Sequence, residues 1–256
     1  AGLTNRLVAG NATHICCGFP QMDAFFPAGK WSFTGNPVRQ NIIDLVDRDN
    51  PANQAAVRAR FGLQPNLPVV FVTGGSLGAR TINEALFVGL VTLAKAGVQV
   101  IWQMGLPFAK THGEAINQLI NDHGDVFLQE GSPRIFHAPF IYDMDDAYLA
   151  SDVVISRAGA ISISEIAVVG RAAVLVPSPN VTDDHQTKNA RVLSDLGAAI
   201  LVTDKMASET LITETLALLK DTKKQAEMQE KLKGIAKPSA TETIVNIIET
   251  CLQKGG

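Results

Sequence analysis

The stretch from Val153 to Asn189 constrains the fold more than any other part of the sequence. It reads as an apolar strand, a glycine turn (SRAGA), a helix, a second apolar strand and a polar loop that leads into another helix. A strand, a helix and a second strand in this order form the βαβ unit of a parallel sheet. Ligands of open α/β sheets bind outside the carboxyl ends of the strands, so both loops of this unit are candidate binding segments.

The alternation of strands and helices extends over most of the chain. Further strands are expected at VVFVT, VQVIWQ, VFLQE, FI and AAILV, separated by helical segments. This pattern predicts an α/β fold with a doubly wound parallel sheet of about six strands. Charged residues make up only 18% of the chain, which suits a sheet that is buried on both faces.

The first 36 residues do not continue this pattern. They contain two strand-like segments, THICCGF and WSFT, which are too few to close a core and are typical of the end of a preceding domain. The segment Asn36-Pro37-Val38-Arg39 follows, and its proline restricts the backbone as expected of a joint between domains. The chain begins without Met at AGLTNR, so we expect a fragment of a longer protein.

Composition argues against several classes of function. The net charge is −3 and no basic block occurs, so a role with nucleic acid has little support. Cys16, Cys17 and Cys251 form neither a disulfide framework nor a metal-ligand pattern, which indicates a reducing, cytoplasmic setting. No run of 18 apolar residues occurs, so no transmembrane segment is expected.

The loop Gly74-Gly75-Ser76-Leu77-Gly78-Ala79-Arg80 lies between an expected strand and a long helix. Backbone N–H groups and the positive end of a helix dipole can hold a phosphate there, but an ordinary tight turn explains the spacing about as well. The loop is neither a Walker sequence nor GxGxxG. A dinucleotide fold also places an acidic residue at the end of the next strand, and that strand ends in Gln103.

The helix after SRAGA begins with Ser162, Ser164 and Glu165. Ser162 and Glu165 match the S-x-x-E capping box, so the pattern favours simple helix capping. The alternative is that Glu165 accepts hydrogen bonds from ribose hydroxyls while the helix amides face a phosphate.

Three further groups of residues admit both a binding and a structural interpretation. His185, Gln186 and Asn189 lie within one turn of a helix start and suit a hexose, although a solvated helix start explains them slightly better. Asp143-Met144-Asp145 is formally a DxD metal motif, but capping by Asp143 is favoured. Basic side chains that could pair with phosphate are Arg39, Arg80 and Arg157.

In this order, several segments of the chain resemble the MurG family of glycosyltransferases. The matching segments are AGLTNR, TGNPVR, GGSLGAR, FIYDMDDAY, ISRAGAISISEIAVVGRAAVLVPSPNVTDDHQTKNA and the closing helices. The resemblance implies the GT-B architecture, in which two Rossmann-like domains face each other across a cleft. It makes residues 1–38 a remnant of the N-terminal, acceptor-side domain with the joint, residues 39–236 the C-terminal UDP-sugar-binding domain, and residues 237–256 a helix returning toward the N-terminal domain.

The resemblance also implies a set of donor-binding residues. Ser76 would contact the diphosphate, Ile141 would receive the uracil through its backbone, Glu165 would bind the ribose, Gln186 would bind the sugar hydroxyls, and Arg39 would lie at the donor side of the joint. The full set implied for UDP-N-acetylglucosamine is Arg39, Ser76, Ile141, Ala160, Ile161, Ser162, Ile163, Ser164, Glu165 and Gln186, with Gly75, His185 and Asn189 in support.

The family transfers N-acetylglucosamine from UDP-N-acetylglucosamine to the C4 hydroxyl of undecaprenyl-pyrophosphoryl-N-acetylmuramyl-pentapeptide, with inversion, in peptidoglycan synthesis. The resemblance implies no metal and no cofactor, because a helix end would hold the diphosphate. It places the intact protein in the bacterial cytoplasm, peripheral on the inner face of the cell membrane.

Two sequence features of the family do not occur in this chain. They are an N-terminal glycine-rich turn with its histidine and a His-Glu-Gln-Asn run just before AGLTNR, which would supply the acceptor site, the general base and the membrane-facing patch. No catalytic residue is therefore assigned, and this fragment is expected to bind the donor without turnover. The alternatives are another GT-B lipid glycosyltransferase, a UDP-N-acetylglucosamine epimerase, and a non-catalytic nucleotide-sugar binding module.

Overall fold

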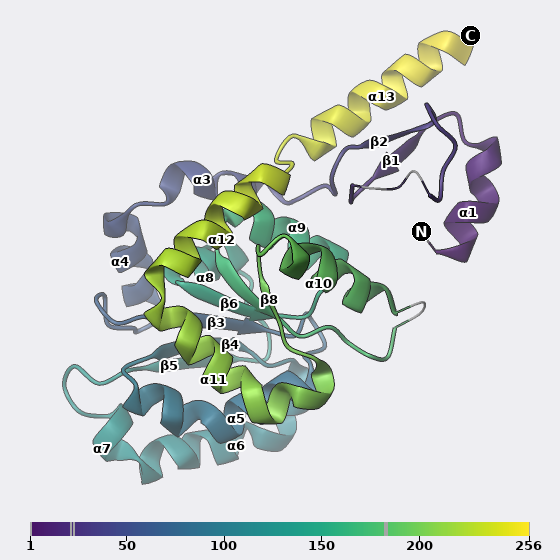
Figure 1. Cartoon of the computed structure of the whole chain (residues 1–256). Helices are drawn as coiled ribbons and strands as arrows, with labels where there is room; N and C mark the ends of the chain where they lie inside the picture. Colours follow the sequence, from purple (N-terminus) through teal and green to yellow (C-terminus); the bar gives the residue numbers. More distant parts are fainter. Residues whose placement is uncertain (1, 21, 23, 182–183, 256) are drawn as a thin grey trace.

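The computed structural model describes residues 2–20, 22, 24–181 and 184–255. It consists of a large α/β part and a small N-terminal lobe, with both chain ends on the side of the small lobe (Figure 1). None of the described helices is long and apolar enough to cross a membrane.

Six parallel strands form the sheet of the large part. They are β3 (Val69–Thr73), β4 (Gln99–Gln103), β5 (Ile135–Ala138), β6 (Val153–Ser156), β7 (Ala172–Leu175) and β8 (Ile200–Leu201). Their spatial order is β5-β4-β3-β6-β7-β8, so the direction of winding reverses between β3 and β6. The predicted doubly wound sheet is confirmed, and its switch point lies between these two strands.

Helices cover both faces of the sheet. They are α2 (Gln40–Ile43), α3 (Leu45–Arg48), α4 (Pro51–Arg60), α5 (Arg80–Lys95), α6 (Leu106–Asp122), α7 (Gly124–Phe127), α8 (Met144–Ala150), α9 (Ala160–Val169), α10 (His185–Asp195), α11 (Ala207–Lys220) and α12 (Thr222–Ile235). Apolar side chains of α2, α3, α4, α8, α9 and α10 fill the core on one face, and those of α5, α6, α7 and α11 fill the core on the other. Every residue of β3, β4, β6 and β7 is buried, as expected of parallel strands with two covered faces.

The sequence interpretation was wrong about two strands, one of which is FI, residues 140–141, where the structure has no strand. VFLQE, residues 126–130, was expected to be a strand, whereas Val126 and Phe127 end the short helix α7 and Leu128 is 54% exposed. The strand is IFHA, residues 135–138, within a segment that had been expected to be irregular. β5 is an edge strand with only half-buried residues, so it lacks the continuous apolar run that marks the central strands.

The small lobe contains α1 (Leu3–Val8), the 3-10 helix η1 (Ala9–Asn11), β1 (Ile15–Cys17) and β2 (Trp31–Phe33). β1 and β2 pair in parallel, and α13 (Ala240–Gly255) leads from the large part toward this lobe (Figure 1). The buried apolar cluster of the lobe consists of Ala9, Cys17 and Phe26. Such a small core agrees with the expectation that these strands alone cannot close one.

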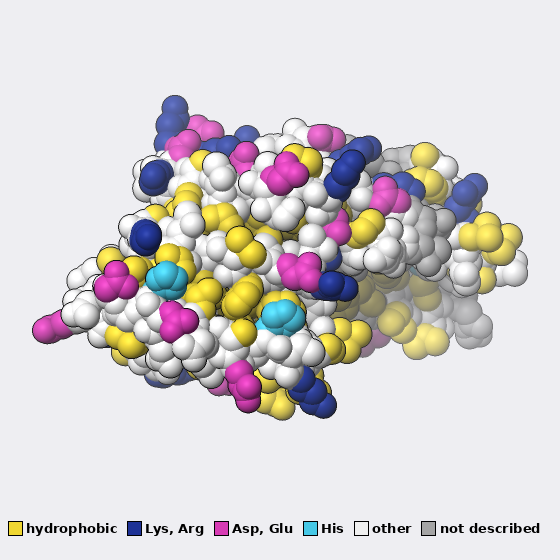
Figure 2. Space-filling view, turned by 90° about the horizontal axis from the view of Figure 1, so that it is seen from below, with side chains coloured by type: hydrophobic (Ala, Val, Ile, Leu, Met, Phe, Trp, Pro, Cys, Tyr) yellow, Lys and Arg dark blue, Asp and Glu magenta, His cyan; other side chains and the backbone are white. Residues whose placement is uncertain are grey.

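The segment after the joint packs on the large part through ion pairs. Arg48 donates to Asp145 and Asp146, and Arg60 also pairs with Asp146, so α3 and α4 are tied to α8. Elsewhere, charges of both signs are mixed: Figure 2 shows the underside of Figure 1, where acidic and basic side chains alternate with apolar ones. The described side chains on that face form no patch of a single charge.

Candidate functional site

Three of the predicted binding segments meet at the edge where the parallel strands end, which we call the carboxyl edge. The loop of residues 74–79 follows β3, the turn before α9 follows β6, and the loop before α10 follows β7. β6 lies between β3 and β7 in the sheet, so the three loops are neighbours in space. They flank the switch point, where ligands of this fold bind. Of the loop before α10, residues 182 and 183 lie outside the described residues.

The loop of residues 74–79 presents an open backbone to solvent. Gly75 and Ser76 are exposed, and the Gly78 N–H donates to the Gly75 carbonyl at 3.0 Å. α5 starts at Arg80, and Ala79 at its N-cap provides no side-chain hydrogen bond to the first helical amides. An anion at this helix end would be stabilised by those amides and by the dipole of a 16-residue helix.

The segment after β4 fixes this loop from behind. Gly78 has a φ of +78°, and a Cβ there would lie 2.1 Å from the Met104 carbonyl oxygen. Gly105 has a φ of +79°, and a Cβ there would lie 2.3 Å from the Leu77 carbonyl oxygen. Only glycine fits at both positions, so the two backbones can approach each other closely.

The start of α9 does not form the capping box that the sequence favoured. The helix begins at Ala160, and Gly159 occupies the N-cap position without a side-chain cap. Ser162 is therefore the third helical residue, and Glu165 lies in the second turn. The capping interpretation of Ser162 and Glu165 was wrong because the helix starts two residues before Ser162.

Glu165 instead forms the centre of a buried hydrogen-bond cluster. Its carboxylate Oε1 accepts from Arg39 Nη2 at 2.9 Å and Nε at 3.2 Å, and its Oε2 accepts from the Tyr148 hydroxyl at 3.2 Å. The Glu165 side chain is 7% exposed, whereas that of Arg39 is 50% exposed. Burial, together with the charge of Glu165, raises the pKa of Tyr148 well above its ordinary value, so its hydroxyl stays a donor.

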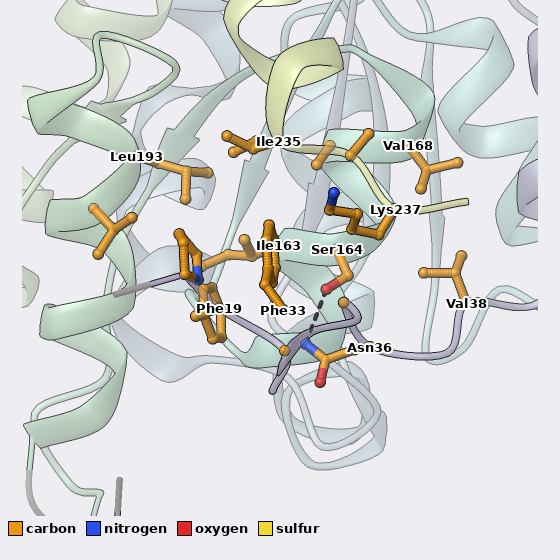
Figure 3. A pocket seen from close by; sticks show the side chains of 16 residues that line it. Phe19, Phe33, Asn36, Val38, Ile163, Ser164, Val168, Leu193, Ile235 and Lys237 are labelled. Carbon is orange, nitrogen blue, oxygen red and sulfur yellow. Dashed lines mark hydrogen bonds between the residues drawn. The ribbon is translucent and has the colours of Figure 1, made fainter. Parts of the chain in front are cut away.

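A second contact ties α9 to the joint. Asn36 Nδ2 donates to Ser164 Oγ at 3.0 Å, one residue before Glu165 (Figure 3). The cavity beside this contact is lined by side chains such as Phe19, Ile163 and Ile235 and has a volume of about 30 Å³. Most of its lining is apolar, so it offers few hydrogen-bond partners to a nucleotide sugar.

The other predicted residues of α9 differ in what they can offer a ligand. Ile163 is buried in the core, so only its backbone could face a ligand. Ile161 is 50% exposed, and Ala160 and Ser162 are half-buried beside it. A bound molecule would therefore cover Ile161 and meet the first amides of the helix.

The polar residues at the start of α10 are brought to the same edge, as predicted. α10 begins at His185, which is exposed. Gln186 Oε1 accepts from the Ser178 N–H at 2.9 Å, and Asn189 Nδ2 donates to the Ala158 carbonyl at 3.2 Å. The first contact holds the loop after β7, and the second ties α10 to the turn before α9.

Sequence reasoning missed two buried polar residues that support the site, Gln103 and Tyr148. The Gln103 side-chain oxygen accepts a hydrogen bond from the Ile141 N–H at 2.9 Å. Because that N–H is already used, a base that binds the Ile141 backbone would bind the Ile141 carbonyl. The only sequence signal for Gln103 is its position at the end of an expected strand. Tyr148 is fully buried on α8 and gives no sequence signal that separates it from core residues.

Several candidate charged residues serve the structure instead. Asp145 pairs with Arg48, whereas Asp143 occupies the N-cap position of α8 without a side-chain cap, so the favoured capping interpretation of Asp143 was wrong. Arg157 donates to Asp204 and to the Val176 carbonyl. Arg80 pairs on the surface with Glu84 of its own helix. Among the described residues, no group of three His, Cys, Asp or Glu side chains is placed to hold a metal ion.

Comparison with known proteins identifies relatives over nearly the whole chain. Residues 69–244 match the glycosyltransferase family 28 C-terminal domain. The chain is 42% identical over 246 residues to the UDP-N-acetylglucosamine–N-acetylmuramyl-(pentapeptide) pyrophosphoryl-undecaprenol N-acetylglucosamine transferase of Cytophaga hutchinsonii. The alignment covers 96% of this chain and 61% of that protein, so the chain spans about three fifths of the relative's length.

Solved structures agree with this comparison. The crystal structure of MurG from Acinetobacter baumannii matches with a TM-score of 0.73 at 30% identity, covering 98% of this chain and 64% of that one. HepE of Anabaena, solved in complex with UDP and glucose, matches with a TM-score of 0.57 at 17% identity, covering 96% of this chain and 67% of that one. The second match shows a shared fold only.

Proposed function

The chain belongs to the MurG family through the C-terminal domain of glycosyltransferase family 28, and on this premise we propose that it binds UDP-N-acetylglucosamine as a sugar donor. The observation that carries the proposal is the convergence of three elements at the switch point of the sheet. They are the exposed loop of residues 74–79, the uncapped start of α9, and the buried carboxylate of Glu165. An anion-binding loop beside a carboxylate suits a diphosphate joined to a ribose diol.

Each part of the donor has a proposed partner. Ser76, with Gly75, would contact the diphosphate, and Ile141 would hold the uracil through its backbone. Glu165 would accept hydrogen bonds from the ribose, within the segment Ala160–Glu165 that lines the nucleotide. Gln186 would bind the hexose hydroxyls with support from His185 and Asn189, and Arg39 would close the site at the joint.

In the longer protein, we propose that the donor sugar is transferred to the undecaprenyl-linked muramyl-pentapeptide. The acceptor C4 hydroxyl would attack the anomeric carbon, the bond from that carbon to the UDP oxygen would break, and a base outside this chain would take the hydroxyl proton. The transition state of such a displacement is oxocarbenium-like. The helix amides near Ser76 would stabilise the negative charge that develops on the departing UDP.

The domain assignments are part of this proposal. Residues 1–38 would belong to the acceptor-side domain and its joint, residues 39–236 to the donor domain, and residues 237–256 to a helix that returns toward the acceptor side. The lipid-linked acceptor and the inner face of the cell membrane would be met through the part of the protein that precedes this chain. We therefore expect the 256-residue chain to bind the donor without transferring it.

Calorimetry with UDP-N-acetylglucosamine tests the proposal. The chain should bind it in preference to UDP-glucose and NAD, and Glu165→Ala should abolish measurable binding because the ribose loses its acceptor. Lys223→Ala is the matched control, since Lys223 lies on α12 with its side chain 88% exposed. Equal binding of NAD would contradict the ligand assignment. Sugar transfer by this chain would contradict the proposal that it binds the donor without transferring it.

A further inference from the structure

Gln103 lies at the carboxyl end of β4 and is 3% exposed. Its side-chain amide makes three hydrogen bonds. Nε2 donates to Thr73 Oγ1 and to the Gly75 carbonyl, both at 3.2 Å, while Oε1 accepts from the Ile141 N–H at 2.9 Å. One buried amide therefore joins the loop after β3 to the turn after β5.

The two loops that it joins come from strands that do not touch. β4 lies between β3 and β5, so a side chain at its end is the direct way to span from one loop to the other. The Thr73 hydroxyl also accepts from the Gly75 N–H at 3.2 Å, which closes a ring of hydrogen bonds at the start of the loop. Both polar ends of Gln103 are thus committed to backbone groups next to the proposed ligand positions.

We propose that Gln103 is a positioning residue of the donor site, which sets the spacing between the groups that hold the uracil and those that hold the diphosphate. The inference rests on the proposed function, in which Ile141 meets the base and Gly75 with Ser76 meets the phosphates. The distance between the base and the phosphates of a nucleoside diphosphate is limited. Both parts can therefore bind at the same time only when the two loops are correctly spaced. Gln103 itself does not contact the ligand.

The chain offers a matched control for a merely structural role. Gln99, at the other end of the same strand, is 0% exposed and also bridges backbone groups through its amide. Its Nε2 donates to the Gln64 carbonyl at 2.8 Å and the Leu67 carbonyl at 3.3 Å, and its Oε1 accepts from the Gln64 N–H at 2.7 Å. The two glutamines share burial and bonding but face opposite edges of the sheet.

The test compares Gln103→Met with Gln99→Met, because Met keeps the length of the side chain and removes the amide. Both variants should unfold at a lower temperature than the unchanged chain. Calorimetric affinity for UDP should fall about tenfold in Gln103→Met, as for the loss of about one well-made hydrogen bond, and should stay unchanged in Gln99→Met. Equal UDP affinity in Gln103→Met and the unchanged chain would overturn the inference.

The outcomes separate this inference from the function on which it rests. If the unchanged chain does not bind UDP, the proposed function fails and the inference with it. If the chain binds UDP and both glutamine variants weaken that binding equally, only the positioning role fails. Should Gln103→Met not fold, Gln103→Glu keeps the acceptor for Ile141 and loses both donors, and it should weaken UDP binding while uridine binding stays unchanged. Equal loss of UDP and uridine binding would overturn the inference.

Discussion

Strand β4 begins and ends with a buried glutamine, and these two residues show how the edges of the sheet differ. At the edge where the strands begin, which we call the amino edge, Gln99 bonds to the backbone of the linker before β3. At the carboxyl edge, Gln103 bonds to the Gly75 carbonyl of a loop whose tip is open to solvent. The same type of side chain therefore holds the linker at one edge and supports the glycine loop at the other.

Charged residues follow the same division. At the amino edge, the carboxylate of Asp152 accepts from Arg58 and from the Val69 N–H at 2.7 Å, so protein donors hold it although the side chain is 33% exposed. At the carboxyl edge, Glu165 is held by Arg39, whose side chain is half-exposed, and by the Tyr148 hydroxyl. We infer that polar groups at the amino edge stabilise the fold, whereas those at the carboxyl edge retain the capacity to bind a ligand.

The largest expected effect on stability is at the amino edge. Arg58 donates to the Ala150 carbonyl at 2.9 Å and the Pro65 carbonyl at 2.8 Å as well as to Asp152. Arg58→Ala leaves all of these acceptors short of a donor and should lower the free energy of unfolding by about 3 kcal/mol, measured by urea unfolding. UDP affinity of the folded fraction should not change. A loss of UDP affinity at unchanged stability would reverse the proposed roles of the two edges.

The glycine loop at the carboxyl edge gives the next largest effect. Gly78→Ala combines a φ of +78° with a Cβ only 2.1 Å from a backbone carbonyl oxygen, whereas Gly75→Ala, at a φ of +84°, meets no atom within 4 Å. The first variant should lose about 2–3 kcal/mol of stability by thermal unfolding and the second about 1 kcal/mol. Equal losses would show that the loop is not held against Met104.

Tyr148→Phe sharpens the contrast within the site. It removes one hydroxyl from Glu165 and keeps the ring that packs edge-on against Phe71 at 5.2 Å. UDP affinity should fall about fivefold, because the carboxylate loses a fixed partner worth about 1 kcal/mol. Affinity for 2′,3′-dideoxy-UDP, which has no ribose hydroxyls, should stay the same in both proteins. An equal loss for the two nucleotides would contradict a link from Tyr148 to the ribose.

The smallest effect concerns pH at the amino edge. Burial would raise the pKa of Asp49, but the hydrogen bond and charge of Arg171, which precedes β7, outweigh it and hold that pKa below its ordinary value. A lowered pKa adds stability above the unfolded-state pKa of about 4, and this stability is lost as the pH falls through the folded value. The difference in melting temperature between the unchanged chain and Asp49→Asn should therefore shrink from pH 6 to pH 3. A constant difference would show that the pair does not titrate.

Much of the large part could be predicted from sequence because its central strands are continuous apolar runs. VVFVT and VQVIWQ became β3 and β4, and the loop after each became part of the carboxyl edge. The edge strand β5 could not be predicted, since its half-buried residues carry no such run. The segment that was expected to form this strand begins instead in the short helix α7.

The positions of the candidate binding loops were predictable from the sequence, but the contacts that support these loops were not. Gly75, Ser76 and the start of α10 follow from glycine content, strand ends and helix signals. The partners of Glu165 come from 126 residues earlier in the chain for Arg39 and 17 residues earlier for Tyr148, and only the folded structure joins them. The capping box failed for a local reason, because the turn at Gly159 lets α9 begin before Ser162.

Hydrogen–deuterium exchange of the chain with and without UDP-N-acetylglucosamine tests the division between the two edges most directly. Protection should increase at residues 74–79, 139–143 and 159–165 on the carboxyl edge. Exchange at residues 63–68 and 150–152 on the amino edge should stay the same. Protection that rises equally at both edges, or at the amino edge alone, would contradict the placement of the donor site at the carboxyl edge.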